Sequence, residues 1–193
     1  MVLMAGEKVL IVHRYSGSPK SDWYQWLKRM LEARDFKVEI VRLPSPDKHT
    51  MEECINSLEV SVLDVENTFF VGHGIGCQAI MRYLEREILG SAKGMLLVAP
   101  LMHLRESALN TPQGKRISDE WLSKPLNFDA VKRNAGTVRI LAAKEDPYIP
   151  EGDAKELASK LGAAVTTMPI RTHFTAEDGY AELHAALNEF MKL

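Results

Sequence analysis

The chain alternates between two patterns of hydrophobic positions. Short runs rich in valine, isoleucine and leucine are typical of strands buried on both faces of a parallel sheet. Between them lie segments whose apolar residues recur with the period of a helix. We expect strands over Lys8–His13, Lys37–Val41, Thr68–Gly72, Gly94–Ala99, Thr137–Ala143 and Ala164–Met168. We expect helices over Ser21–Ala33, Met51–Leu63, Ile75–Leu89, Gly152–Leu161 and Ala176–Met191.

This alternation predicts an α/β fold, a three-layer α/β/α sandwich around a mainly parallel sheet of about six strands. The 193 residues form one predicted domain, residues 1–193. One stretch, Leu101–Lys132, breaks the alternation with Pro112, Gly114 and Pro125 and has no long periodic run. An insertion after the carboxyl end of a strand lies over the ligand crevice of such a sheet. We therefore predict a short cap over residues 101–132.

Composition narrows the classes of function. The net charge of −2 gives no basic surface for nucleic acid. The longest apolar runs are too short to span a bilayer, and the N-terminus lacks the pattern of a secretory signal. Cys54 and Cys77 lie in no Cys/His cluster, so we expect neither a metal site nor a cofactor. A cytoplasmic protein without membrane contact is the expectation.

The segment after the third predicted strand carries the first chemical signal. Its sequence Gly72-His73-Gly74-Ile75-Gly76 joins a strand directly to a helix, which is the setting of the nucleophile elbow G-x-S-x-G. The outer glycines allow strand and helix to pack closely around a sharp turn. The central residue takes a strained backbone conformation that points its side chain into the site. Here the central residue is Gly74, whose side chain is a hydrogen atom.

An acid and a base follow in the chain. Asp146 comes after the fifth predicted strand, and His173 after the sixth. The order elbow, acid, histidine is that of α/β-hydrolases, so we predict that Asp146 orients His173 as a general base. The oxyanion hole should use the amide of Ile75 and a second amide from the loop after the first strand, at Arg14 or Tyr15.

The sequence resembles the α/β-hydrolase superfamily, in particular the small serine hydrolases of the retinoblastoma-binding-protein-nine and YdeN type. The resemblance covers nearly the whole chain. It implies an esterase-like activity on small acyl compounds, with Asp146 as the acid, His173 as the base and Gly74 at the position of the serine. Arg14 stands where many relatives have a glycine. The matching motifs are His13, Asp22–Leu27, Leu43–Pro46, Val71–Cys77, Asp146–Pro150 and His173-Phe174.

Three explanations of Gly74 stay open: a natural non-catalytic member, an engineered inactive variant, or chemistry with another nucleophile or with water. We expect Cys77 to pack in the core, and we expect Ser16 and Ser18 to be turn residues. His73 should point away from the site.

The residues support two functions. In the first, the chain is a serine hydrolase family member whose acyl transfer is lost or strongly impaired. In the second, it is a non-catalytic module that binds a small molecule or a protein in the former hydrolase pocket. A small acyl ligand or substrate is the expected partner. His13, which should orient its loop, and Arg14 are candidates for lining the pocket.

Overall fold

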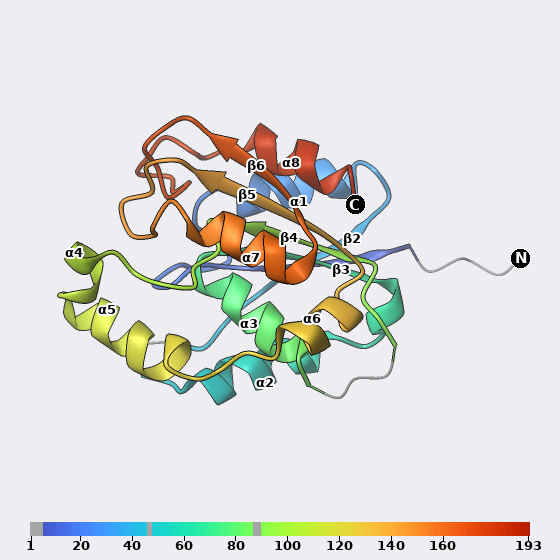
Figure 1. Cartoon of the computed structure of the whole chain (residues 1–193). Helices are drawn as coiled ribbons and strands as arrows, with labels where there is room; N and C mark the ends of the chain where they lie inside the picture. The colour runs from blue at the N-terminus through green and yellow to red at the C-terminus, as the bar shows by residue number, and fades with distance from the viewer. Residues whose placement is uncertain (1–5, 46–47, 87–89) are drawn as a thin grey trace, which may run out of the picture.

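A computed structural model describes residues 6–45, 48–86 and 90–193 of the chain. Its centre is a six-stranded, fully parallel sheet in the order β2-β1-β3-β4-β5-β6 (Figure 1). The predicted parallel α/β architecture is confirmed. The strands are β1 (Lys8–Val12), β2 (Lys37–Val41), β3 (Thr68–His73), β4 (Gly94–Val98), β5 (Thr137–Ala143) and β6 (Ala164–Met168).

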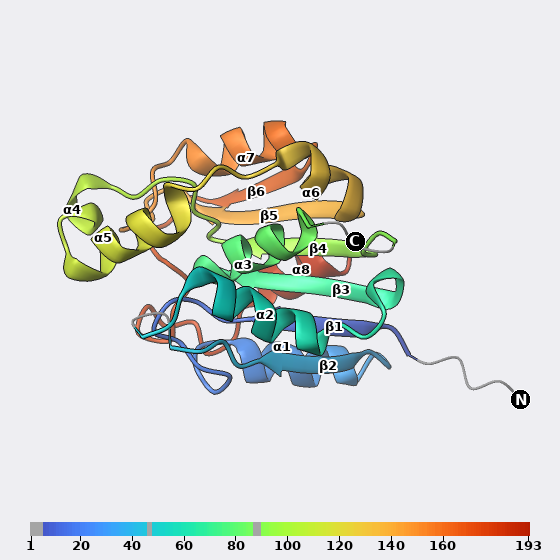
Figure 2. The ribbon, with the colours of Figure 1, turned by 90° about the horizontal axis from the view of Figure 1, so that it is seen from below.

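Helices cover both faces of the sheet, which confirms the three-layer sandwich (Figure 2). Within the described ranges, no helix combines the length and the apolar character needed to cross a membrane. A 3-10 turn, η1 (Val65–Asn67), precedes β3. One face carries α1 (Tyr24–Glu32) and α8 (His184–Phe190), and the other carries α2 (Met51–Ser61), α3 (Ile75–Leu84), α6 (Phe128–Asn134) and α7 (Asp153–Leu161).

One helix and two strands differ from the sequence prediction. The last helix was expected over Ala176–Met191 but begins only at His184, because Gly179 has a φ of +94° and turns the chain away from a helix. Strands β2 and β6 were expected to be buried on both faces, and this is wrong: both are edge strands and are partly exposed. The predicted end of the third helix, at residues 87–89, lies outside the described residues.

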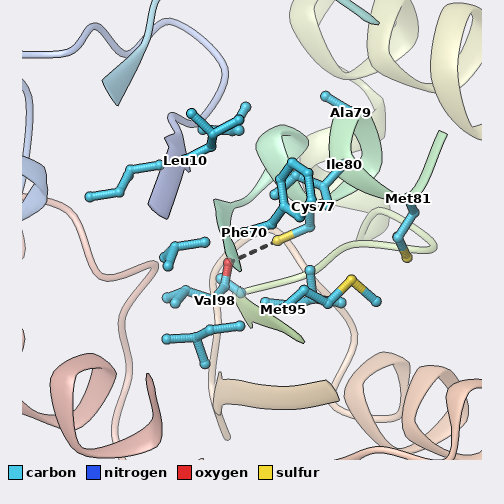
Figure 3. Close-up of a cluster of buried hydrophobic side chains, with 14 of the residues drawn as sticks. Leu10, Phe70, Cys77, Ala79, Ile80, Met81, Met95 and Val98 are labelled. Atoms are coloured by element: carbon cyan, nitrogen blue, oxygen red, sulfur yellow. Dashed lines mark hydrogen bonds between the residues drawn. The ribbon is translucent and has the colours of Figure 1, made fainter. Parts of the chain in front are cut away.

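The core lies around the central strands β1, β3 and β4. Their side chains form an almost continuous apolar layer beneath α3, as Figure 3 shows for Leu10, Phe70 and Met95. Cys77 belongs to this layer, and its thiol donates a 3.4 Å hydrogen bond to the Val98 carbonyl. Burial raises the pKa of this thiol, so Cys77 is an inert packing residue, as predicted.

The topology places a crevice at the carboxyl ends of β1 and β3. The chain passes from β1 to β2 on one side and then to β3 on the other, so the strand order reverses between β1 and β3. Val12 and Gly72 are register partners near the ends of these two strands. Ligands of open parallel sheets bind outside such a reversal point. The loop after β1 and the turn into α3 therefore meet where a site is expected.

Helix α3 approaches the sheet more closely than a side chain would allow. A Cβ atom on Gly76 would lie 2.2 Å from the Val12 carbonyl oxygen, and one on Gly72 would lie 2.8 Å from the Cys77 nitrogen. Both neighbours are backbone atoms and have no rotamer with which to move away. The outer glycines of the elbow are thus required by packing alone.

The insertion after β4 projects beyond the carboxyl edge of the sheet (Figures 1 and 2). It contains α4 (Glu106–Leu109), α5 (Pro112–Ile117) and the π-helical turn η2 (Ser118–Leu122). Within the predicted stretch 101–132, α6 lies on the sheet face, so the part before α6 forms the cap. Arg82 of α3 is buried and fixes the end of the cap by donating to the carbonyls of Trp121, Lys124 and Pro125 at 2.8, 2.6 and 2.9 Å.

Replacing Gly76 by alanine should lower the free energy of unfolding by about 3 kcal/mol, because the new methyl group meets rigid backbone. The matched control is Gly152→Ala, whose Cβ meets no atom within 4 Å at a φ of −74°. That control should stabilise the protein by about 0.5 kcal/mol. Urea unfolding of both variants measures the difference. Equal stabilities would contradict the close approach of α3 to β1.

Candidate active site

Gly74 links β3 to α3 and has the backbone conformation of an elbow. Its φ of 55° and ψ of −117° lie where L-residues are strained and glycine is not. An ideal Cβ at this position would lie 3.2 Å from His173 Nε2 and 3.4 Å from Arg14 Cβ. A side chain on residue 74 would therefore project towards the imidazole of His173, as the elbow motif predicts.

The structure brings Asp146 and His173 together at the elbow. The Nδ1–H of His173 donates to Asp146 Oδ2 at 2.8 Å. The other carboxylate oxygen accepts the backbone N–H groups of Tyr148 and Ile149 at 2.8 and 3.1 Å. Because Nδ1 is the donor, the neutral imidazole presents the lone pair of Nε2 to the space before Gly74.

The loop that carries the acid is held by a residue of the cap. Arg105 Nε donates to the carbonyls of Asp146 and Ile149 at 2.8 and 3.0 Å, and the Arg105 N–H donates to the Tyr148 carbonyl at 2.8 Å. The cap and the acid loop therefore form one unit. Sequence reasoning missed Arg105, because no local pattern connects two segments 41 residues apart.

A chain of hydrogen bonds through buried Tyr24 and His73 fixes the backbone of His173. The N–H of Arg14 donates to the hydroxyl of Tyr24 at 3.1 Å, and this hydroxyl donates to His73 Nδ1 at 2.7 Å. His73 Nε2–H then donates to the His173 carbonyl at 2.7 Å. Burial lowers the pKa of His73 well below its usual value and raises that of Tyr24 well above it, so both groups are neutral. His73 points away from the cavity, as predicted, yet it holds the base.

His13 lies beneath the loop after β1 and not among the residues that line the cavity, which corrects its place as a pocket candidate. Its Nε2 accepts the Leu43 N–H at 3.1 Å, so Nδ1 carries the proton and donates to the Arg14 carbonyl at 2.9 Å. Both ring nitrogens are therefore used in orienting the loop. Burial lowers the pKa of His13, so the imidazole is neutral.

Arg14 does line the cavity, and its charge is compensated. Its Nε is 2.8 Å from Asp22 Oδ2, and a terminal nitrogen is 3.4 Å from Glu177. The Asp22 side chain is buried and also accepts the Ala176 N–H at 2.8 Å. The Arg14 amide donates to the Tyr24 hydroxyl, so it is not available as the second oxyanion donor. Tyr15, the other residue predicted for this role, lines the cavity.

A cavity of about 830 Å³ lies between the elbow and the cap. Gly74, Ile75 and His173 form its floor, and the ring of Tyr148 stands edge-on to His173 with centroids 5.1 Å apart. The cap side is largely apolar. This arrangement suits a small molecule with an apolar body and a polar end. The apolar residues of the cap that line the cavity are Leu101, Leu104, Ala108, Pro112 and Ile117, and Ile75, Pro147 and Ile149 add further apolar surface.

Residues 9–192 match the Serine hydrolase family. The chain belongs to this family. It is 28% identical to YdeN of Bacillus subtilis (strain 168) over 179 residues, which is 92% of this chain and 90% of YdeN. It is 24% identical to serine hydrolase RBBP9 of Rattus norvegicus over 155 residues, covering 79% and 77% of the two chains. The crystal structure of the B. subtilis ydeN gene product superposes with a TM-score of 0.86 at 24% identity, covering 96% and 97%.

A serine hydrolase needs a nucleophile, and the other candidate side chains of this family member are poorly placed. Cys77 Sγ points into the core towards Val98. Ser18 Oγ lies 3.1 Å from Ser21 Oγ and does not line the cavity. Ser16 lines the cavity, but no hydrogen bond joins it to His173 in the part of the chain that the structure describes.

The buried chain of hydrogen bonds can be tested by Tyr24→Phe. This change leaves His73 Nδ1 without its donor and the Arg14 N–H without its acceptor, and it should lower the free energy of unfolding by about 2 kcal/mol. Tyr83→Phe is the control, because the Tyr83 hydroxyl has no hydrogen bond in the described residues. Its cost should stay below about 0.5 kcal/mol. Similar losses in the two variants, measured in urea, would refute the role of Tyr24.

The stability of the protein should fall as the pH drops below about 6.5. His13 and His73 have lowered pKa values in the fold, so the unfolded chain binds their protons first, and stability is lost with falling pH. Asp22, 4.0 Å from His73, opposes this effect but does not outweigh burial. Each histidine adds a slope of up to about 1.4 kcal/mol per pH unit.

Unfolding in urea at pH 5.0, 5.5, 6.0 and 7.0 measures this slope. Carboxylates with lowered pKa values, such as Asp178 and Glu189, contribute only at lower pH. In the variant His73→Gln, the slope of unfolding free energy against pH should be smaller by up to about 1.4 kcal/mol per pH unit, which is the contribution of one proton. A slope unchanged from that of the unmodified protein would show that His73 is not buried in its neutral form.

Proposed function

We propose that this chain binds a small acyl compound in the cavity beneath the cap and does not form an acyl-enzyme. The observation that carries the proposal is Gly74 in an elbow conformation, with a hydrogen atom where the G-x-S-x-G motif has the serine side chain. The base and the acid are aligned, but the elbow offers them no hydroxyl group to activate. A serine enzyme without its nucleophile keeps only about 10³–10⁴-fold acceleration over water.

The remaining groups favour an acyl compound over other ligands. The Ile75 N–H opens helix α3, has no partner within the helix and lies at its positive end, so it can donate to a carbonyl oxygen. His173 Nε2 faces the same space. The apolar side chains of the cap provide a surface for the hydrocarbon part of the ligand.

Hydrolysis by water is the second candidate function, and the retained pair of Asp146 and His173 at 2.8 Å favours it. In this reaction, His173 Nε2 takes a proton from a water molecule while the water oxygen attacks the carbonyl carbon of the ester. The leaving alcohol regains a proton from the imidazolium. No covalent intermediate with the protein forms.

The variant Gly74→Ser restores the missing hydroxyl group and should raise kcat/KM on short p-nitrophenyl esters by about 100-fold or more. It should also react with a fluorophosphonate probe, whereas the unmodified protein should not. Gly74→Ala is the matched control, because it adds the same Cβ without the hydroxyl. Each variant should lose about 1 kcal/mol of stability from the positive φ.

The outcomes separate the possibilities. Covalent labelling of the unmodified protein at any residue would overturn the proposal. Equal ester hydrolysis by the serine and alanine variants would show that the elbow no longer aligns a nucleophile. Turnover by the unmodified protein that His173→Gln abolishes, without any labelling, would favour hydrolysis by water.

A further inference from the structure

His173 presents a hydrogen-bond acceptor that no donor satisfies among the residues the structure describes. Its Nδ1–H is committed to Asp146, and in the described ranges no hydrogen bond joins Nε2 to another residue. His173 lines the cavity. The residue is 9% exposed, and Nε2 lies 3.2 Å from the ideal Cβ position of Gly74. In a serine hydrolase the seryl hydroxyl donates to this nitrogen. Here the donor has to come from whatever occupies the cavity.

A matching donor stands opposite this acceptor. The N–H of Ile75 is the first of the ten-residue helix α3 and has no partner within the helix. Ile75 is buried and lines the same cavity as His173. The hydrogen side chain of Gly74 leaves room between the two groups, since a Cβ would already be in close contact with Nε2. One acceptor and one donor therefore face the same small space.

We propose that the cavity binds a carboxylate together with one proton, an inference that rests on the proposed function and names its ligand class. One ligand oxygen accepts the Ile75 N–H, and the other takes the position of the absent seryl oxygen and shares a proton with His173 Nε2. The ligand arrives as a carboxylate and takes one proton from solvent. No covalent bond of the protein forms or breaks. The apolar body of the ligand lies against the cap.

The charges around His173 explain why a proton must accompany the ligand. The carboxylate of Asp146 faces Nδ1 from the loop after β5. Arg14, from the loop after β1, is paired with buried Asp22. His73, from β3, is neutral because burial lowers its pKa. None of these groups supplies a free positive charge for an incoming anion.

The segment before α8 adds two more carboxylates. Asp178 Oδ2 accepts the backbone N–H groups of His173 and Thr175 and the hydroxyl of Thr172, which lowers the pKa of Asp178. Glu177 is exposed and reaches Arg14 at 3.4 Å. An unprotonated ligand would therefore bring an uncompensated negative charge into a buried site, which is costly. One added proton cancels this charge.

The geometry discriminates between related compounds. A carboxylic acid provides both the acceptor for Ile75 and the O–H for His173. A methyl ester keeps the acceptor but has no O–H, so Nε2 receives no hydrogen bond from it. A primary amide provides an N–H donor but takes up no proton. Acid and amide should both bind more tightly than ester, and only the acid should take up a proton on binding.

Calorimetric titration with hexanoate, hexanamide and methyl hexanoate tests this order. At pH 7, hexanoate should bind at least tenfold more tightly than the ester. Repeating the titration in phosphate and in Tris, whose ionisation enthalpies differ, should give an uptake close to one proton per hexanoate. The dissociation constant for hexanoate should rise about tenfold per pH unit above pH 7 if one proton is bound.

Gly74→Ala places a methyl group where the second ligand oxygen would lie and should weaken hexanoate binding at least tenfold. His173→Gln should abolish the proton uptake. Gly152→Ala, at a glycine with open space around it, should bind as the unmodified protein does. A cooperative melting transition in each of the two site variants establishes that they are folded.

Three results would overturn the inference in distinguishable ways. Ester and acid binding equally, with no proton uptake, would reject the carboxylate while leaving an acyl-binding cavity in place. No binding of any of the three compounds would reject both the carboxylate and the proposed function. Tight hexanoate binding that survives Gly74→Ala would place the ligand elsewhere in the cavity.

Discussion

The arrangement of the site depends on two buried, neutral side chains, Tyr24 and His73. The Tyr24 hydroxyl accepts a hydrogen bond from the Arg14 N–H and donates one to His73 Nδ1. His73 Nε2–H in turn donates to the carbonyl of His173. Three segments from different parts of the chain are thereby joined: the loop after β1, the end of β3 and the loop that carries the base. Burial keeps the Tyr24 hydroxyl and the His73 imidazole uncharged, so the donor and the acceptor of each hydrogen bond are fixed. The loop after β1 and the loop that carries His173 are therefore held in one position relative to each other.

The local features of the fold were predictable because each depends on a short stretch of chain. The elbow is visible in Gly72, Gly74 and Gly76, since close packing of strand and helix and a positive φ all demand glycine. The strands follow from apolar runs between polar segments. Asp146 and His173 follow from their places after the last two strands, because parallel strands end at one edge of the sheet.

What holds the site together was not predictable, because its partners are distant in sequence. Arg105 binds the Asp146 loop across 41 residues, and Tyr24 reaches His73 across 49. A tyrosine inside a helix with an apolar stripe reads as ordinary core, and an arginine at the start of a cap reads as surface. The late start of α8 was not predictable either. The segment from Thr172 is folded around the Asp178 carboxylate, and these hydrogen bonds compete with helix formation.

The shape of the elbow does not depend on which side chain stands at residue 74. Gly72 and Gly76 are required by backbone contacts with α3 and β1, so the turn forms whatever residue stands between them. At Gly74 the positive φ carries no strain. The fold therefore maintains an elbow, an oriented base and a helix amide without depending on a nucleophile.

The acid–base pair has a structural role that accounts for only one of the two imidazole nitrogens. Asp146 binds two backbone N–H groups and His173 Nδ1, so it would be retained simply to hold its loop. Nothing in this structural role uses Nε2, yet this nitrogen is directed at the space before Gly74 and beside the amide of Ile75. A purely structural histidine would bury or satisfy its second nitrogen, as His13 and His73 both do. The proposed ligand depends on this lone pair of His173, because no donor to it is found among the described residues.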